Sequence, residues 1–362
     1  MILLRILAPV CGIWLVIFTL RSAIRNFVLP RSAPDLVAFV TFRVVRSLFT
    51  LRMRWATTYE QRDQIMAMYA PISLLLLVPI WLTMVLIGYM GIYWGLGIDS
   101  ISQDFVLSGS SLFTLGFATG TSALHTFVAF TEAAIGLILV ALLIAYLPTM
   151  YSVFSQREAA VTQLAIRAGT PPSVEEFISR HQRIGKLHNL APYWRDWESL
   201  FSLIEESHTS LPALVFFRSP TPEQSWLTAA GAVMDSAAFM QAVVDVPITA
   251  EASLCIRAGF IALRRICDFY AIPYNDAPTF PKEPISITRE EFDAVCDALV
   301  SQGVPLRANR EQAWLEFAGW RVNYDRPLTL LCGLVMAPYA PWSSDRSVRV
   351  LLPSIKSRWR EL

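Results

Sequence analysis

The sequence predicts an all-α membrane protein with three transmembrane helices, a re-entrant loop between the second and third, and an α-helical cytoplasmic domain. The first observation is composition, because 54% of the residues are hydrophobic and 16% are charged, against about a quarter charged in soluble domains. The second is a gap in the charge map, since residues 64–156 contain no Lys or Arg. The third is the helical patterning after Arg157, where charge returns. The net charge of +1 provides no global basic field, so no nucleic-acid partner is expected.

The first apolar segment, residues 1–20, is expected to be a retained transmembrane helix. A cleaved signal peptide would instead place the following loop outside the membrane. That loop, residues 21–63, contains eight arginines and three acidic residues. Cytoplasmic loops are enriched in Lys and Arg, so we expect this loop inside, the N-terminus outside, and the chain after Arg157 in the cytoplasm.

Residues 21–70 form the predicted basic linker, and part of it has the pattern of an amphipathic helix. One face carries Arg43, Arg46, Ser47, Thr50 and Arg54. The opposite side is apolar and consists of Val37, Ala38, Val45, Leu48 and Phe49. Such a helix is suited to the anionic inner leaflet, so membrane lipids are expected partners. A solvated connector is the alternative.

Residues 71–156 contain two apolar runs that are long enough to cross a bilayer, 71–96 and 131–152. The segment between these runs is too apolar for an exposed loop. Asp104 to Phe113 can form about three helical turns, with Asp104 where a carboxylate favours the helix dipole. An extended stretch of mostly small residues follows, up to Gly120. Non-helical backbone at membrane depth is tolerated only where it is buried or lines a cavity, so residues 104–120 are predicted to re-enter the membrane.

This arrangement resembles the potassium-channel pore-loop family over residues 71–155. The segment Thr114, Leu115, Gly116, Phe117, Ala118 and Thr119 stands where that family has Thr-Val-Gly-Tyr-Gly-Asp. The resemblance implies a selectivity filter in which the backbone carbonyls of the first four residues replace the hydration shell of K+ or another monovalent cation. One such loop occurs in this chain, so a closed ring implies a homotetramer. Ala118 and Thr119 depart from the family pattern, which leaves tight and weak potassium selectivity both open.

Three residues of the third span are candidates for roles in such a pore. Four copies of Glu132 near an outer mouth would concentrate cations, whereas the alternative is an interfacial carboxylate that marks where the helix leaves the headgroups. Gly136 and Pro148 are candidate bends for gating. The alternative for both is close helix packing.

Residues 157–362 are predicted to form a helical cytoplasmic domain. Helix starts are indicated where Ser, Thr or Asn is followed three residues later by Glu or Gln, at Ser173, Thr221, Thr288 and Asn309. No G-x-G-x-x-G motif follows a strand-like run, so a nucleotide-binding regulator is not supported.

Two helices of this domain attract attention. Residues 224–246 are rich in small side chains, which permit close helix approach, and Asp235 lies in this apolar stretch. The next predicted helix, 250–270, carries Arg257 and Arg264 on one face. Asp235 is expected to pair with one of these arginines, either as a structural ion pair or as part of an anion or ligand site.

No enzyme motif is present. The five cysteines form no C-x-x-C pair. His125, His181, His188 and His208 show no metal-ligand spacing and are expected at the surface. We therefore expect neither a catalytic site nor a cofactor or metal beyond the permeant cation.

Together, the resemblance and the topology imply a homotetrameric cation channel, regulated by its cytoplasmic domain. The excess of Arg over Lys is typical of a GC-rich prokaryotic genome, which favours a bacterial plasma membrane. The cytoplasmic domain also leaves room for a ligand or protein partner. The alternative function is a non-conducting sensor or scaffold, anchored in the membrane by a pore-loop fold.

Overall fold

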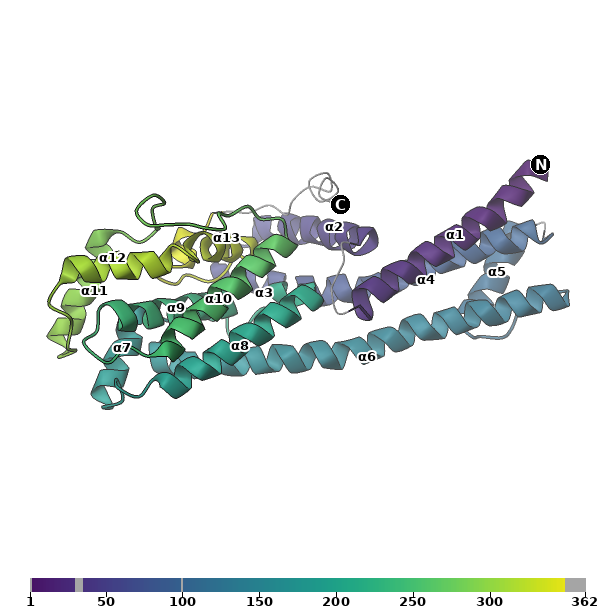
Figure 1. Ribbon diagram of the computed structural model, residues 1–362. Coiled ribbons are helices and arrows are strands. Elements are labelled where there is room, and N and C mark those ends of the chain that lie inside the picture. The colour runs from purple at the N-terminus through teal and green to yellow at the C-terminus, as the bar shows by residue number, and fades with distance from the viewer. Residues whose placement is uncertain (1, 30–34, 99, 349–362) are drawn as a thin grey trace. The chain divides into compact units, whose positions relative to one another are not determined.

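A computed structural model describes residues 2–29, 35–98 and 100–348. Over these residues the chain is all-helical, without strands, and an isolated bridge pairs Val244 with Leu306 (Figure 1). Three segments are long and apolar enough to cross a membrane, Leu3–Phe27, Tyr59–Gly95 and Ala123–Ala168. The chain divides into unit 1, Met1–Trp55 with Ile65–Ser152, and unit 2, Ala56–Gln64 with Val153–Leu362.

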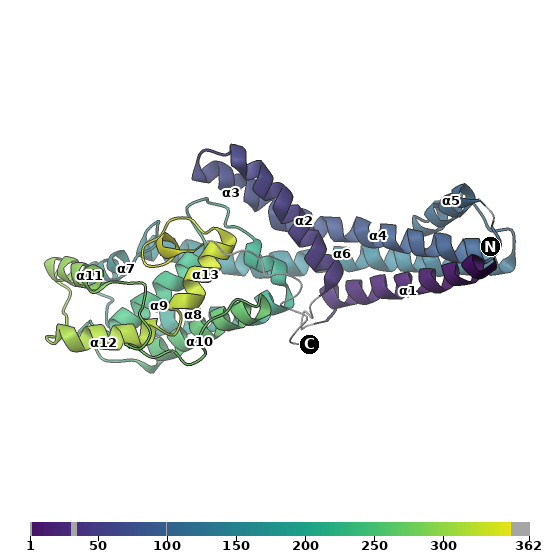
Figure 2. The same cartoon turned by 90° about the horizontal axis from the view of Figure 1, so that it is seen from above.

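In unit 1, α1 (Ile2–Phe27) lies along α4 (Tyr69–Gly95), as both ribbon views show (Figures 1 and 2). Glycines allow this close approach, because a Cβ at Gly12 would lie 2.2 Å from the carbonyl oxygen of Gly88. Near the other end of the seam, the Trp81 indole donates a hydrogen bond of 2.9 Å to Ser22 Oγ. The two apolar helices therefore pack through backbone contact and one buried polar bond.

The predicted amphipathic helix is α2 (Leu36–Arg52), which is confirmed as a helix. Asp35 caps it, since its carboxylate accepts from the Ala38 amide at 2.9 Å and from Ser22 Oγ at 2.8 Å. One face is buried, chiefly against α4. A second apolar stripe stays exposed and consists of Val40, Val44, Leu48, Leu51 and Trp55. A short 3₁₀ turn, η1 (Met53–Trp55), and α3 (Tyr59–Ala67) lead from α2 to α4.

The last two helices of unit 1 are α5 (Ile101–Leu112) and α6 (Ala123–Ala168). The helix expected over residues 104–113 is thus present, three residues longer at its start. The third apolar helix begins eight residues earlier than the predicted position 131 and continues past 152. Glu132 consequently lies inside α6 rather than at its start. Pro148 lies within the same continuous helix, whose final part, 153–168, belongs to unit 2.

Unit 2 is built around α9 (Trp226–Ala242), in which every residue is buried. A helix that is apolar on all sides needs neighbours on all sides. The neighbours are α7 (Val174–Arg183), α10 (Ala250–Phe269), α12 (Arg310–Arg321) and α13 (Asp325–Val335). The small residues of α9 make this packing possible, as predicted. The remaining elements are α8 (Ala191–Ser210), η2 (Pro212–Phe216), α11 (Arg289–Ser301) and η3 (Ser344–Arg346).

Three of the four helix starts indicated by the sequence are confirmed. Ser173, Thr288 and Asn309 each cap a helix, and Thr288 forms a full capping box with Glu291. The start at Thr221 is wrong, because residues 221–224 form a turn and the helix begins at Trp226 with Ser225 as its cap. Pro222 suits that turn as well as it suits a first helical turn, so the local pattern does not distinguish the two.

Candidate functional site

The helices α5 and α6 meet at two points in unit 1. Ser108 of α5 donates a hydrogen bond to Glu132 of α6. One turn further along both helices, a Cβ on Gly136 would lie 2.3 Å from the carbonyl oxygen of Leu112. Both partners advance by four residues between the two contacts, so the two helices run in the same sense where they meet. Gly136 thus permits the end of α5 to touch the α6 backbone.

Glu132 is the polar centre of this contact. Its side chain is fully buried, with 0% exposure, and its carboxylate accepts hydrogen bonds from Ser108 and from the Tyr93 hydroxyl of α4, the latter at 3.0 Å. The neighbouring Thr131 bonds to the Tyr89 hydroxyl at 2.9 Å. The Glu132 carboxylate therefore faces the two neighbouring helices α4 and α5 rather than solvent.

Asp104 and His125 are also buried near the starts of α5 and α6. Asp104 is 1% exposed, and its Oδ1 atom has no hydrogen-bond partner among the residues that the structure describes. His125 was expected at the surface but is 7% exposed, with Nδ1 at 3.3 Å from the Thr121 hydroxyl. The expectation is wrong because Thr121 and Gly120 fold back onto this histidine, and a Cβ on Gly120 would lie 2.3 Å from the His125 Cβ.

The loop that connects α5 to α6 contains the six candidate filter residues. It leaves α5 in a tight turn, since the Thr114 amide donates to Ser111 O at 3.0 Å and the Leu115 amide to Ser110 O at 2.8 Å. The left-handed conformations fall at Thr114, with φ of 55°, and at Gly116, with φ of 72°. Ala118 is outside that region, so its methyl group carries no such backbone strain here.

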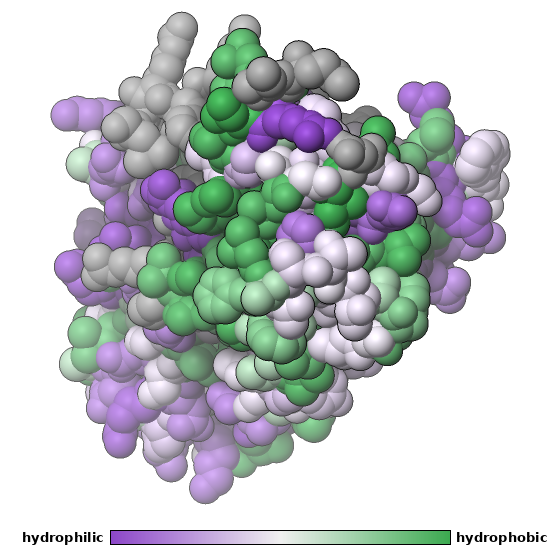
Figure 3. All heavy atoms as spheres, turned by 90° about the vertical axis from the view of Figure 1, so that its right-hand side faces the viewer, coloured by the Kyte–Doolittle hydropathy of each residue, from purple (hydrophilic) through white to green (hydrophobic). Residues whose placement is uncertain are grey.

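A serine tethers the middle of the loop to α5. The Ser110 hydroxyl accepts from the Ala118 amide at 3.0 Å and lies 3.4 Å from the Ala118 carbonyl oxygen. Several apolar side chains around this tether project outward. Phe113, Leu115 and Phe117 are 52%, 62% and 68% exposed. Figure 3 views the end of unit 1 that carries α5, and hydrophobic side chains are prominent on that face.

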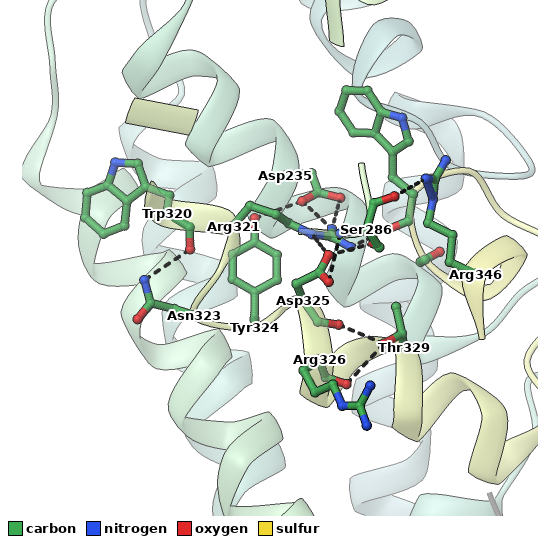
Figure 4. Close-up of polar contacts among 12 residues, drawn as sticks. Asp235, Ser286, Trp320, Arg321, Asn323, Tyr324, Asp325, Arg326, Thr329 and Arg346 are labelled. Carbon is green, nitrogen blue, oxygen red and sulfur yellow. Dashed lines mark hydrogen bonds and ion pairs between the residues drawn. The ribbon is translucent and has the colours of Figure 1, made fainter. Parts of the chain in front are cut away.

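The ion pair expected for Asp235 is formed with a different arginine. Arg321 of α12 donates through Nη1 to both Asp235 oxygens at 2.7 Å, and its Nε donates to Asp325 at 2.7 Å (Figure 4). Although burial disfavours its charged form, the carboxylates of Asp235 and Asp325 raise the pKa of the Arg321 guanidinium above its usual value.

Neither arginine of α10, Arg257 or Arg264, pairs with Asp235. Arg257 is exposed, and Arg264 donates to the carbonyl oxygens of Asn323 and Asp276 at 2.9 Å each. The expected pairs are wrong because the helical face that carries these arginines does not meet the Asp235 side of α9. With Tyr324 also donating to Asp235 at 2.8 Å, the carboxylate is fully used inside the protein, which favours the structural alternative over a ligand site.

A second buried cation in unit 2 is Arg157, which the sequence suggested only as a marker of the membrane boundary. Its side chain is 1% exposed and donates to Glu158 and to the carbonyl oxygens of Leu214 and Phe217, all at 2.8 Å. It also donates to Nε2 of His208 at 3.0 Å. His208 thus accepts at Nε2, which requires the neutral imidazole.

Two histidines of unit 2 correct the surface expectation. His208 is 0% exposed and His181 is 5% exposed, whereas His188 is exposed as expected. Burial, together with the nearby Arg157 charge, holds the pKa of His208 well below its usual range. The sequence signal that was available is weak: His208 lies on the buried face of α8 with Trp197, Phe201 and Ile204 at helical spacing.

No group of three or more His, Cys, Asp or Glu side chains suited to a metal occurs in the part of the chain that the structure describes. Comparisons with protein-family models, with curated proteins and with solved structures found no match to this chain. The features that bear on function are therefore the membrane-compatible helices and the contacts among α5, the loop and α6.

Proposed function

We propose that the protein is a pore-loop cation channel of a bacterial plasma membrane, assembled as a homotetramer and regulated by unit 2. The observation that carries the proposal is that α5 and α6 run in the same sense where they meet. Leu112, the last residue of α5, contacts Gly136, which lies 13 residues beyond the first residue of α6.

The contact between Leu112 and Gly136 constrains the path of the loop that joins the two helices. At 1.5 Å of rise per residue, the α6 segment from Ala123 to Gly136 is about 20 Å long. Residues 113–122, which are not helical, must run from the end of α5 back to the start of α6 over that length. Ten residues can span up to roughly 35 Å. A descending short helix, a rising non-helical segment and a second descending helix are the parts of a pore loop.

The exposed side chains of this region support assembly. A lone re-entrant segment would leave non-helical backbone against lipid, which is tolerated only if protein or a water-filled cavity surrounds it. One loop per chain makes a ring of four chains the simplest enclosure. Phe113, Leu115 and Phe117 would then be covered by neighbouring protomers, and the carbonyl oxygens of Thr114 to Phe117 would coordinate K+ or another monovalent cation.

The remaining parts fit an orientation with the N-terminus outside. The arginines of α2 and its flanks would meet the anionic inner leaflet, and the exposed stripe of Val40, Val44, Leu48, Leu51 and Trp55 would enter the lipid interface. Unit 2 would lie in the cytoplasm. Because α6 contributes residues to both units, a partner or ligand that binds unit 2 could act on the pore through this one continuous helix.

The second candidate is a non-conducting sensor or scaffold on the same fold. It is favoured by the replacement of the family's Gly and Asp with Ala118 and Thr119, and by the Ser110 hydroxyl that occupies the Ala118 amide. A monomer or dimer in detergent would favour this candidate, because neither can close a four-loop ring.

The test is ion flux from liposomes that contain the purified full chain, with potassium, sodium and rubidium compared. Intact tetramers that conduct at least one of these ions support the channel. Intact tetramers without flux under any ionic condition contradict it.

A further inference from the structure

We infer that Glu132 is a positioning residue. It keeps the filter loop in place by binding α5 on the side opposite the loop. This role rests on the proposed pore, and it differs from an ion-concentrating ring at the pore mouth. The basis is geometric: one buried carboxylate accepts from α4 through Tyr93 and from α5 through Ser108, while itself belonging to α6.

The Ser108 hydroxyl stands at the meeting point of the three helices. Besides its bond to Glu132, it lies 3.3 Å from the carbonyl oxygen of Leu86 in α4. A carboxyl group suits the position because it offers two oxygens, one for each hydroxyl.

The opposite side of α5 holds the loop. Ser110 is two residues from Ser108, and residues two apart on a helix project about 200° from each other. Ser110 binds the Ala118 amide at 3.0 Å, so the same helical turn is fixed to Glu132 on one side and to the filter candidate on the other. Displacement of this turn therefore moves the backbone of Ala118 directly.

The contact between Leu112 and Gly136 completes the arrangement. It seats the end of α5 on α6 one turn beyond Glu132, immediately before the loop begins. With the serine bond and this backbone contact both made, α5 has two points of attachment to α6. Loss of the first leaves α5 held by the second contact and by its packing against α4.

The experiment compares variants that break the α5 attachment with variants that break only the α4–α6 contact. Ser108→Ala and Glu132→Ala remove the bond between α5 and α6. Tyr89→Phe and Thr131→Val serve as matched controls, because the Tyr89–Thr131 bond lies one residue away and does not involve α5. Glu132→Gln is the conservative variant, since its amide retains a hydrogen bond to either hydroxyl.

Two readouts are measured on the full chain: the potassium-to-sodium permeability ratio in liposomes, and amide hydrogen exchange of residues 113–120 in detergent. We expect Ser108→Ala and Glu132→Ala to change the ratio by on the order of tenfold, as for one lost buried hydrogen bond, and to accelerate exchange in the loop. Glu132→Gln should restore both in large part, and the controls should match the wild type. Tetramer content is checked for each variant.

Equal behaviour of Ser108→Ala, Glu132→Ala and the two controls in both readouts would overturn the positioning role. If the wild-type tetramer conducts no ion, the proposed channel fails, but the exchange comparison still decides whether Glu132 orders the loop. Should Glu132→Ala not assemble, Ser108→Ala carries the same comparison, because it removes one hydroxyl and leaves the carboxylate bonded to Tyr93.

Discussion

Replacing Arg157 with methionine removes a buried guanidinium from unit 2 and leaves its acceptors without a donor. Methionine is chosen because its flexible apolar side chain can fill most of the vacated space. The acceptors that lose a bond are Glu158, His208 and the carbonyl oxygens of Leu214 and Phe217. We expect a marked loss of stability of unit 2.

The magnitude follows from the partners. Removal of one member of a buried ion pair costs about 3–5 kcal/mol, and each orphaned buried carbonyl adds about 1 kcal/mol or more. The methionine side chain restores part of the lost packing, which offsets some of this. A net loss of about 4 kcal/mol is therefore expected, which corresponds to a Tm lower by about 10 °C for a unit of this size.

The assay is thermal unfolding of the full chain in detergent, followed by intrinsic tryptophan fluorescence. Arg195→Ala is the control, because this side chain is 63% exposed and lies 3.6 Å from Glu251. Exposed pairs contribute less than about 1 kcal/mol, so this control should lower the Tm by no more than about 3 °C. Equal shifts for Arg157→Met and Arg195→Ala would refute the reasoning.

Three further predictions follow from the buried groups and the tight glycine. The pKa of His208 is held well below its usual range, so the unfolded chain binds the proton first as the pH falls. The stability of unit 2 should therefore fall by up to about 1.4 kcal/mol per pH unit below pH 6.5. His208→Gln should flatten this dependence when the Tm is measured from pH 7.5 to 5.5. Gly136→Ala should push α5 away and cost about 1–3 kcal/mol, whereas Gly109→Ala, with no atom within 4 Å, should leave the Tm and the loop's hydrogen exchange unchanged. Arg321→Met should lower the Tm as strongly as Arg157→Met, and addition of Asp235→Asn should recover part of the loss; no recovery would contradict the paired arrangement.

The membrane-compatible helices were predictable because composition alone determines them. A segment without cations over residues 64–156 has few ways to be stable except among apolar neighbours. The short helix α5 was also predictable, since Asp104 at its first turn and the small residues after Leu112 mark its two ends.

The start of α6 was not predictable from hydropathy. Residues 123–130 include His125 and Thr126 and follow a run of small polar residues, so they read as loop. In the structure, His125 is buried under the returning chain, and the helix begins at Ala123. This shift of two turns changes the position of Glu132 from the end of a helix to its interior, and with it the role inferred for the carboxylate.

The partners of the buried charged residues could not be predicted from the sequence, for a different reason. Asp235 pairs with Arg321, which is 86 residues away, and Arg157 binds carbonyls 57 and 60 residues away. Helical periodicity indicates which face a residue occupies, but it does not indicate which helix covers that face. Arg257, the first arginine after Asp235, and Arg264 were therefore the wrong choice.

Ion flux through reconstituted wild-type protein, compared with Gly116→Ala and Gly109→Ala, tests the proposed pore most directly. Gly116 has a φ of 72° in the candidate filter, a conformation that a side chain strains, whereas Gly109 of α5 has open space around it. We expect potassium flux for the wild type and for Gly109→Ala, and lost or non-selective flux for Gly116→Ala. Unchanged flux in Gly116→Ala, or no flux in any of the three tetramers, would contradict it.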